Sequence, residues 1–244
     1  WLLHPGSRDF LLSLSFNNVI FFSTFMTMKY KHIIWDWNGT LVNDLTLCVD
    51  LLNVSLEKRG LPLISKNIYK QKFLFPIKKF YETVGFDFSK ENFESTNEEF
   101  HSGYEANFKK LALQPYAFET ISSFKNLGIT QSILSATTQR KLNVQVNFFG
   151  ISRFFDNVVG ISNTPSGYGK EFEGKELLRS VNISLKDTII IGDSMLDFNV
   201  SKALGIDCAL VSNGHNNIER LQATGSMTFA NIQSFADWIL EKTR

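Results

Sequence analysis

Short apolar runs rich in β-branched residues recur along the chain from residue 29 onward, separated by segments of helix length. These runs lie at 32–36, 129–136, 156–161, 188–194 and 208–214. Such runs are typical of strands buried on both faces, and strands that alternate with helices form right-handed βαβ units. The pattern therefore predicts an α/β fold, in which a parallel sheet carries helices on both faces.

One stretch interrupts this alternation. Between about 47 and 112 apolar residues recur at three- and four-residue spacings without a strand pattern, which predicts an all-helical insert. Aromatic residues at helical spacing form a core more often than they line a ligand cleft. Those of the insert are Phe73, Phe75, Phe80, Tyr81, Phe86, Phe93, Phe100, Tyr104 and Phe108. We predict a core formed by 29–46 plus 113–244 and a helical insert at 47–112.

Residues 1–28 fit neither pattern. The run 10–28 is apolar, but it has neither the period of a strand nor that of an amphipathic helix. A secretory signal requires a basic region before the apolar run and a small-residue cleavage site, and only Arg8 precedes this run. A membrane span requires a continuous apolar segment, and polar residues interrupt this one. We expect 1–28 to lie outside the fold, with Met26 or Met28 as the natural start.

Composition narrows the classes of partner. The chain has 25 basic and 24 acidic residues, so no global charge attracts nucleic acid or an acidic membrane surface. Cys48 and Cys208 lie far apart and show no CxxC or Cys/His spacing, which argues against a disulfide scaffold and against zinc. We expect two reduced, buried thiols in a cytoplasmic protein that acts on a small molecule.

Polar residues follow the tips of four predicted strands. These residues are, in chain order, Asp36, Ser135, Lys170 and the pair Asp193 and Asp197. Gly39 permits the tight turn that ends the first strand. Because ligands bind beyond the carboxyl ends of parallel strands, we expect all of these side chains to converge at one edge of the sheet.

Carboxylates gathered at one edge repel one another unless a hard cation binds among them. Mg²⁺ prefers carboxylate oxygens, a backbone carbonyl and water. We therefore predict a magnesium site with four protein ligands, formed by Asp36, the backbone of Asn38, Asp193 and Asp197. An aspartate is already ionised at neutral pH and can attack phosphorus as a nucleophile. Magnesium and Lys170 would offset the repulsion between Asp36 and an anionic phosphate.

A phosphate site is predicted beside this metal. The Ser135 hydroxyl and the backbone amides that follow it, beginning with Ala136, can hold a phosphoryl oxygen at a helix start. Lys170 and the turn at Asn38 and Gly39 complete the predicted site. Structural roles are also open, because a lone serine is often a helix cap and a lone lysine is usually solvated. The conjunction of these residues in this order favours the functional interpretation.

These segments resemble the four motifs of the haloacid dehalogenase-like superfamily of phosphatases, in the same order: DWNGT (36–40), ILSATT (133–138), Lys170 and GDSMLD (192–197). The helical insert resembles the cap of the phosphoglycolate phosphatase-like subgroup. The resemblance implies a Rossmann-like core and an aspartyl phosphate on the first aspartate. It also implies that the serine and lysine hold phosphate and that the last acidic pair binds Mg²⁺.

The first motif departs from the family pattern at Asn38. Family phosphatases usually carry a second aspartate there, which protonates the leaving oxygen and later activates water. An amide can do neither, so acid–base assistance worth about 10²–10⁴ in rate is in doubt. Asn43 also stands where such motifs carry an acid. Asp44 is the nearest remaining carboxylate, and we do not expect it to reach the leaving group.

Several functional hypotheses share these residues. The leading one is a magnesium-dependent phosphatase for a small phosphorylated metabolite. The alternatives are a phosphate- or phosphometabolite-binding protein with reduced catalysis, and a phosphomutase. Haloacid dehalogenation is disfavoured, because that reaction does not require the acidic metal pair.

Two further residues receive no functional role. Lys175 matches the spacing of a nucleotide-binding loop, but Glu176 stands where a serine or threonine would bind magnesium, so Lys175 is predicted to lie on a helix surface. His215 is interpreted as a loop or helix-start residue.

Overall fold

The computed structural model of the protein describes residues 28–162 and 170–241. The predicted extension 1–28 therefore lies outside the described residues, except for Met28, which is buried in the core. Residues 163–169, which directly precede Lys170 in the sequence, lie outside the described residues as well. Within the described ranges, no helix has both the length and the apolar character that a membrane span requires.

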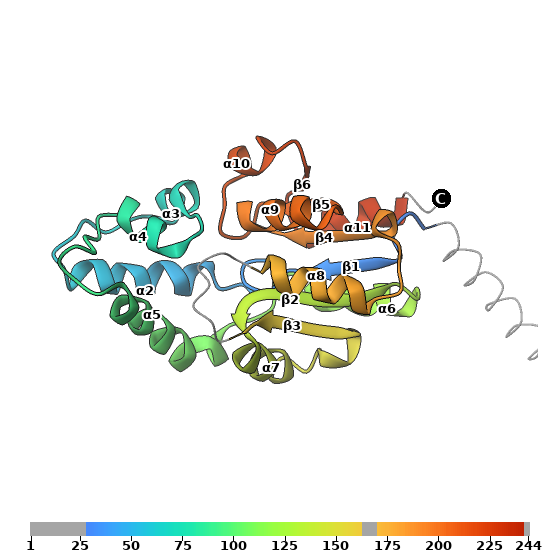
Figure 1. Ribbon diagram of the computed structural model, residues 1–244, viewed down its shortest axis with the longest axis horizontal. Coiled ribbons are helices and arrows are strands. Elements are labelled where there is room, and N and C mark those ends of the chain that lie inside the picture. The colour runs from blue at the N-terminus through green and yellow to red at the C-terminus, as the bar shows by residue number, and fades with distance from the viewer. Residues whose placement is uncertain (1–27, 163–169, 242–244) are drawn as a thin grey trace, which may run out of the picture.

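A parallel sheet of six strands organises the molecule, with the order β3-β2-β1-β4-β5-β6 (Figure 1). The strands are β1 (His32–Trp35), β2 (Thr130–Thr138), β3 (Asn157–Ile161), β4 (Thr188–Gly192), β5 (Asp207–Val211) and β6 (Met227–Phe229). The five predicted strands and their parallel pairing are confirmed. Sequence reasoning missed β6, because three residues at a sheet edge are too few to show a period.

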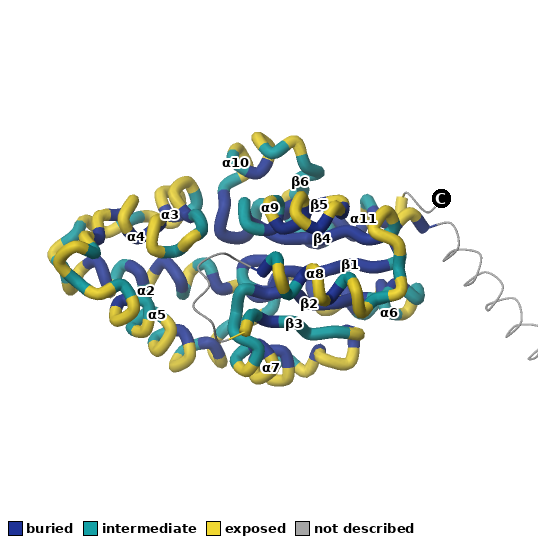
Figure 2. Tube along the Cα trace, viewed as in Figure 1, coloured by how far each residue is buried: buried dark blue, intermediate teal, exposed yellow. Residues whose placement is uncertain are grey.

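Alternation along the strands explains why helices cover both faces of the sheet. In β1 the side chains of Ile33 and Trp35 enter one apolar cluster, and Ile34 enters another on the opposite face. Such two-sided burial is typical of parallel sheets and accounts for strands without polar positions. Figure 2 shows β1 and β4 as buried along their lengths. The α/β prediction is therefore confirmed.

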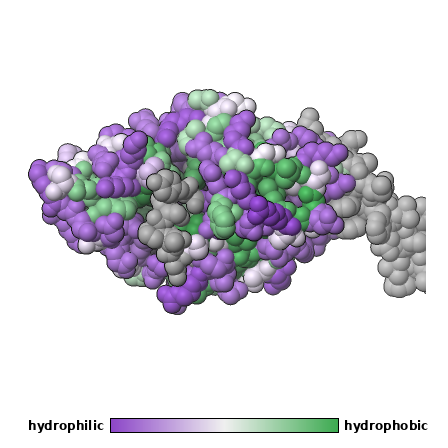
Figure 3. All heavy atoms as spheres, in the orientation of Figure 1, coloured by the Kyte–Doolittle hydropathy of each residue, from purple (hydrophilic) through white to green (hydrophobic). Residues whose placement is uncertain are grey.

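Two layers of helices enclose the sheet. One face is covered by α6 (Ala117–Asn126), α7 (Gln139–Phe148) and α11 (Ile232–Glu241). The other face is covered by α8 (Glu171–Ser180), α9 (Met195–Leu204) and α10 (Ile218–Gln222). Hydrophilic residues cover much of the molecular face drawn in Figure 3. The helices of these two layers cover the faces of the sheet, so a site can form at the carboxyl ends of the strands.

The segment between β1 and β2 is helical, as its spacing predicts. It contains α2 (Leu45–Glu57), α3 (Lys66–Lys72), α4 (Ile77–Thr83), α5 (Phe93–Asn107) and the short 3₁₀ turn η1 (Phe108–Lys110). These helices share an apolar cluster separate from those of the sheet, and all of the predicted aromatics belong to it or pack against it. We call the segment 47–112 the cap; its division from the core as a domain stays a prediction. The cap stands over the carboxyl ends of β1 and β4 (Figure 1).

Candidate active site

Asp36 directly follows β1 and begins a tight turn. Its backbone N–H donates to Ile191 O of β4 at 2.9 Å, which extends the strand ladder by one residue. The turn closes where the N–H groups of Leu41 and Val42 donate to Trp37 O, at 3.0 and 2.9 Å. Gly39 has a φ of +78°, and a Cβ there would overlap the side chain of Asp193. The turn therefore requires glycine for both its conformation and its closeness to the neighbouring carboxylate.

Three carboxylates meet at the sheet edge, as the sequence predicts. Each of Asp36, Asp193 and Asp197 offers one oxygen, and these oxygens lie within 4.8 Å of one another. Lys170 lies at the start of α8 and is fully buried among them. Its Nζ forms ion pairs with Asp36 and, at 2.8 Å, with Asp197, and it donates to Leu134 O at 2.8 Å. These four predicted residues therefore form one cluster.

The electrostatics of this cluster are those of excess negative charge. Burial, reinforced by the charge of Asp197, raises the pKa of Asp36 to about 8 although Lys170 opposes the shift. Burial also raises the pKa of Asp193 to about 6. For Lys170, burial lowers the pKa, but the charges of Asp197 and Asp36 raise it overall. One ammonium does not balance three carboxylates in a site from which water is largely excluded.

The residues present fit a divalent cation. When all three carboxyls are ionised, they exceed the single ammonium of Lys170 by two negative charges, and a cation of charge two such as Mg²⁺ would favour that ionised state. None of the described residues donates a hydrogen bond to the backbone carbonyl of Asn38, which leaves this predicted ligand available. Thr40 Oγ1 donates to Asp193 Oδ1 at 3.1 Å and fixes that carboxylate. Oxygen ligands and charge both match the preference of magnesium.

The second predicted strand tip requires a correction. β2 does not end at Ser135, because it continues to Thr138 through an irregularity in its pairing with β3, and no helix starts directly after Ser135. The hydroxyl of Ser135 accepts a hydrogen bond from Thr137 N at 3.0 Å. A bulge of this kind re-aims the residues after it, which a strand pattern does not reveal. Phosphate binding by Ser135 and Ala136 stays a prediction.

Asn38 is half-buried, and its side-chain amide lies at the centre of a hydrogen-bond network. Its Oδ1 accepts from Thr137 Oγ1 at 2.8 Å. Its Nδ2 donates to Asp44 Oδ2 at 2.7 Å and to Tyr104 OH of α5 at 2.8 Å. The amide that stands in place of the family's acid thus connects β2, the first motif and the cap.

The chain matches the family described as haloacid dehalogenase-like hydrolase over residues 33–211. It belongs to this family. It is 21% identical to phosphoglycolate phosphatase 1 of Pseudomonas aeruginosa over 198 residues, which cover 79% of this chain and 73% of the relative. It is also 21% identical to a phosphoglycolate phosphatase of Pseudomonas fluorescens over 200 residues, which cover 75% and 70%. The predicted family and its phosphoglycolate phosphatase-like character are confirmed.

Solved structures show the same fold for this haloacid dehalogenase-like hydrolase. A chain from Clostridium acetobutylicum assigned as a phosphatase superposes with a TM-score of 0.73 at 21% identity, covering 87% of this chain and 99% of that one. A chain from Thermotoga maritima assigned as a beta-phosphoglucomutase has a TM-score of 0.62 at 17% identity, with 86% and 97% covered. At these identities the likeness supports the fold and leaves the substrate open.

Asp44 is the residue of this hydrolase that sequence reasoning undervalued. It is fully buried, and its two oxygens accept four hydrogen bonds. The donors are Gly39 N at 2.9 Å, Asn38 Nδ2 at 2.7 Å, Tyr104 OH at 2.8 Å and His215 Nε2 at 3.1 Å. The carboxylate therefore fixes the turn that carries the first motif against the cap.

His215 lies in the loop after β5, as predicted, but its side chain is buried and engaged. Its Nδ1 contacts Tyr69 OH of α3 at 3.2 Å, and its backbone N–H donates to Asp193 Oδ2. Its position in the sequence could have indicated this role, because the loop after β5 lies at the same edge of the sheet as Asp36. Cys48 also approaches Asp44 and His215. Since hydrogen bonds already occupy both oxygens of Asp44 and both ring nitrogens of His215, this second group is not a metal site.

The buried pair of His215 and Asp44 predicts a pH-dependent contribution to stability. Burial alone lowers the pKa of His215, but the charge of Asp44 raises it overall from 6.5 to about 9. A raised pKa means that the stabilisation is complete below about pH 6.5 and is lost as the pH rises through about 9. We expect His215→Gln to be destabilised by an amount on the order of 3 kcal/mol near pH 6 and by much less near pH 10.

The measurement is the free energy of unfolding in urea, determined for wild type and His215→Gln across this pH range. All other titratable groups are the same in the two proteins, so the difference between their pH profiles isolates the pair. A constant difference from pH 6 to pH 10 would show that His215 is neutral throughout.

Proposed function

We propose that this haloacid dehalogenase-like hydrolase is a magnesium-dependent phosphatase that acts on a small phosphorylated metabolite through an aspartyl phosphate on Asp36. The observation that carries the proposal is the buried cluster of three carboxylates and Lys170 at the sheet edge. The curated relatives are phosphoglycolate phosphatases, so phosphoglycolate is the first metabolite to test. Two free, buried cysteines support a cytoplasmic location.

The first step is attack by Asp36. One carboxylate oxygen forms a bond to phosphorus as the ester P–O bond breaks, which leaves an acyl phosphate on the protein and an alkoxide that takes up a proton. Lys170 holds the carboxylate and balances part of the charge that gathers as two anions meet. The tight turn at Gly39 aims the backbone of the first motif at the same point.

The second step is hydrolysis of the acyl phosphate. Water attacks phosphorus, the bond to Asp36 breaks, and inorganic phosphate leaves with the carboxylate restored. Asp36, Asp193, Asp197 and the backbone carbonyl of Asn38 would hold magnesium, which supplies charge neutralisation for the transferring group. Thr40 and the backbone of His215 hold Asp193 in place.

Asn38 favours a second candidate function. Its amide provides no proton for the leaving oxygen and no base for water, which lowers the expected rate. This one residue therefore favours, as the second candidate, a protein that binds a phosphometabolite at the same metal site and turns it over slowly. A phosphomutase shares every residue of the cluster, and it differs from a hydrolase in its product: an isomeric phosphate ester instead of inorganic phosphate.

Magnesium dependence provides the direct test of the proposed function. Purified protein is expected to release inorganic phosphate from an aryl phosphate and from phosphoglycolate when Mg²⁺ is added, and to lose this activity in excess EDTA. Restoring Mg²⁺ in excess over EDTA should restore turnover. Equal turnover with and without the metal would exclude the mechanism. Metal binding without phosphate release would favour the binding protein.

A further inference from the structure

Gln114 is a buried glutamine in the segment that leads from the cap back to the core. This segment pairs with the one that enters the cap: Asn43 N donates to Ala112 O at 3.0 Å, and Gln114 N donates to Leu41 O at 2.8 Å. Its side chain takes no part in the proposed catalytic steps. A buried amide needs partners for both its oxygen and its nitrogen, since leaving either unpaired costs free energy. Those two partners therefore show what the side chain holds.

The Gln114 side chain joins two loops that carry the carboxylate cluster. Its Nε2 donates to Gly39 O at 2.9 Å, in the turn of the first motif. Its Oε1 accepts from Asn213 Nδ2 at 3.0 Å, in the loop after β5. Two residues further along this loop, His215 N donates to Asp193 Oδ2. One side chain thus connects the turn of the first motif to the loop that holds Asp193.

Gly39 is the residue of the turn whose backbone most needs to be held. Glycine has access to more backbone conformations than other residues, and this one adopts a φ of +78°. The peptide group before it is fixed, since Gly39 N donates to Asp44 Oδ1 at 2.9 Å and to Val42 O at 3.0 Å. The peptide group after it is fixed by the bond from Gln114 to Gly39 O. Asp44 and Gln114 therefore hold the two peptide groups on either side of this glycine.

The direction of the Asn38 carbonyl depends on how this turn is held. In a trans peptide the C=O group and the N–H group of the next residue lie in one plane and point in opposite directions. The Gly39 N–H points at Asp44 and Val42, so the Asn38 C=O points away from them. Release of Gly39 O would let the backbone rotate at the glycine, and the Asn38 carbonyl would lose its fixed place beside the cluster.

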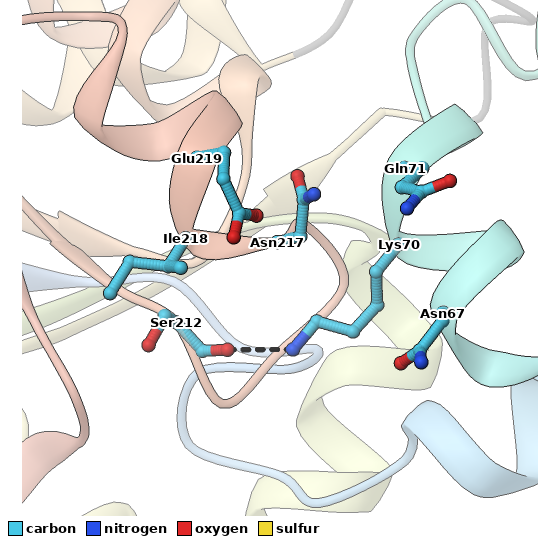
Figure 4. Close-up of a pocket in the computed structure, with 7 residues that line it drawn as sticks. All are labelled: Asn67, Lys70, Gln71, Ser212, Asn217, Ile218 and Glu219. Carbon is cyan, nitrogen blue, oxygen red and sulfur yellow. Dashed lines mark hydrogen bonds between the residues drawn. The ribbon is translucent and has the colours of Figure 1, made fainter.

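The loop after β5 is a firm anchor for this contact. Lys70 Nζ of α3 donates to Ser212 O at 2.7 Å, directly before Asn213 in the chain (Figure 4). On the other flank, Asn216 N donates to Asp193 O at 3.3 Å. The loop is thus bonded to the cap on one side and to the residue after β4 on the other. A glutamine bonded to this loop can therefore restrain the turn that it contacts at its other end.

We propose that Gln114 is a positioning residue for the metal site, and that it ties the place of the Asn38 carbonyl to that of Asp193. The inference rests on the proposed function, in which both of these residues would hold magnesium. It adds a residue that sets the affinity for the metal from outside the cluster. Gln114 acts through Gly39 and Asn213, the two residues with which its side chain forms hydrogen bonds.

The test is the affinity of the full-length protein for Mg²⁺, measured by calorimetric titration of the metal alone. Gln114→Met keeps the length of the side chain and removes both of its hydrogen bonds. We expect the dissociation constant for Mg²⁺ to rise by about 10–100-fold, the scale typical of groups that hold metal ligands in place. The Mg²⁺ concentration for half-maximal hydrolysis of an aryl phosphate should rise by a similar factor. The value of kcat in saturating Mg²⁺ should change much less, because the bound metal itself restrains the carbonyl.

Gln131→Met is the matched control, because it removes the same two kinds of hydrogen bond from another buried glutamine. Gln131 Nε2 donates to Ile121 O at 2.9 Å, and Gln131 Oε1 accepts from Trp35 Nε1 at 3.0 Å. Gln131 lies near the amino end of β2, far from the carboxyl edge of the sheet. This variant should lose stability in urea as Gln114→Met does and should keep the wild-type affinity for Mg²⁺.

Asn213→Ala keeps the test decisive if Gln114→Met does not fold. It removes only one of the two bonds, at a half-buried position. It should weaken Mg²⁺ binding in the same direction and by a smaller factor. Where both variants fold, the double variant should bind Mg²⁺ no more weakly than Gln114→Met alone, because the bond that the two residues share is lost only once.

Two results would overturn the proposal. Gln114→Met and Asn213→Ala could each bind Mg²⁺ with wild-type affinity, or Gln131→Met could weaken Mg²⁺ binding as much as Gln114→Met, which would show a general effect of lost stability. Failure of the proposed function is distinguishable from these. Wild type that binds no Mg²⁺ would overturn the function and this proposal together, whereas wild type that binds Mg²⁺ and releases no phosphate would overturn the function alone.

Discussion

Asp36→Ala is expected to reduce phosphate release by roughly 10⁴-fold or more, the scale on which enzymes respond to loss of a nucleophile. Asp36 is the only strand-tip residue of the cluster that both contacts Lys170 and lies in the turn of the first motif. No neighbouring group can replace its attack, because Asp197 is already held by Ser194 and Lys170. The measurement is steady-state hydrolysis of an aryl phosphate in saturating Mg²⁺.

Asp50→Ala is the matched control for this variant. It removes an aspartate from the exposed side of α2, away from the cluster, and should leave turnover at the wild-type level. Rapid-quench labelling with a radioactive substrate should detect a phosphorylated wild-type protein and none with Asp36→Ala. Equal turnover by Asp36→Ala would remove the aspartyl phosphate from the mechanism.

Asn38→Asp is expected to increase kcat by about 10²-fold or more, because it restores a group that can exchange protons with the leaving oxygen. The structure adds a reason why this group would act as an acid. The Asn38 amide donates to Asp44 Oδ2 at 2.7 Å, so an aspartate there places two carboxyls in contact. Two like charges at that separation raise the pKa of one of them, which retains its proton near neutral pH.

The gain from Asn38→Asp should therefore depend on pH. It is largest where the shared proton is present and declines at higher pH, where both carboxyls ionise and repel each other. The pH–rate profile of kcat, measured beside that of wild type, provides the test. Asn43→Asp is the control, because it makes the same substitution at an exposed position of the same motif. An unchanged rate in Asn38→Asp would mean that Asn38 does not limit turnover.

The alternation of apolar runs determined much of the fold before any coordinates. In β1 three adjacent apolar residues serve two opposite clusters, and a pattern with no polar position is what a strand buried on both faces requires. The helical spacing of apolar residues in the cap predicted its helices for the same reason, because the aromatic residues at these positions are buried against one another. Local periodicity reports burial, so it predicts elements and leaves their exact ends open.

Some parts of the candidate site could likewise be predicted from the sequence, and others could not. Asp36, Asp193 and Asp197 could be placed together because each follows a strand or begins a helix at the carboxyl edge of a parallel sheet. The path of β2 beyond Ser135 could not, because a bulge depends on pairing with β3. The structural role of Asp44 could not be predicted either, because one of its hydrogen-bond partners is His215, which lies 171 residues away in the chain.

The sequence by itself determined the sheet, its helical layers, the helical character of 47–112 and the chemical types gathered at one edge, because these follow from short-range patterns and from the geometry of parallel strands. Only the tertiary structure decided which polar groups meet. Asn38 with Asp44, His215 with the cap, and Lys70 with the loop after β5 are contacts between segments far apart in the chain. A hydrogen bond depends on the distance and direction between two groups in space, and the order of residues in the chain gives neither for groups that lie far apart in it.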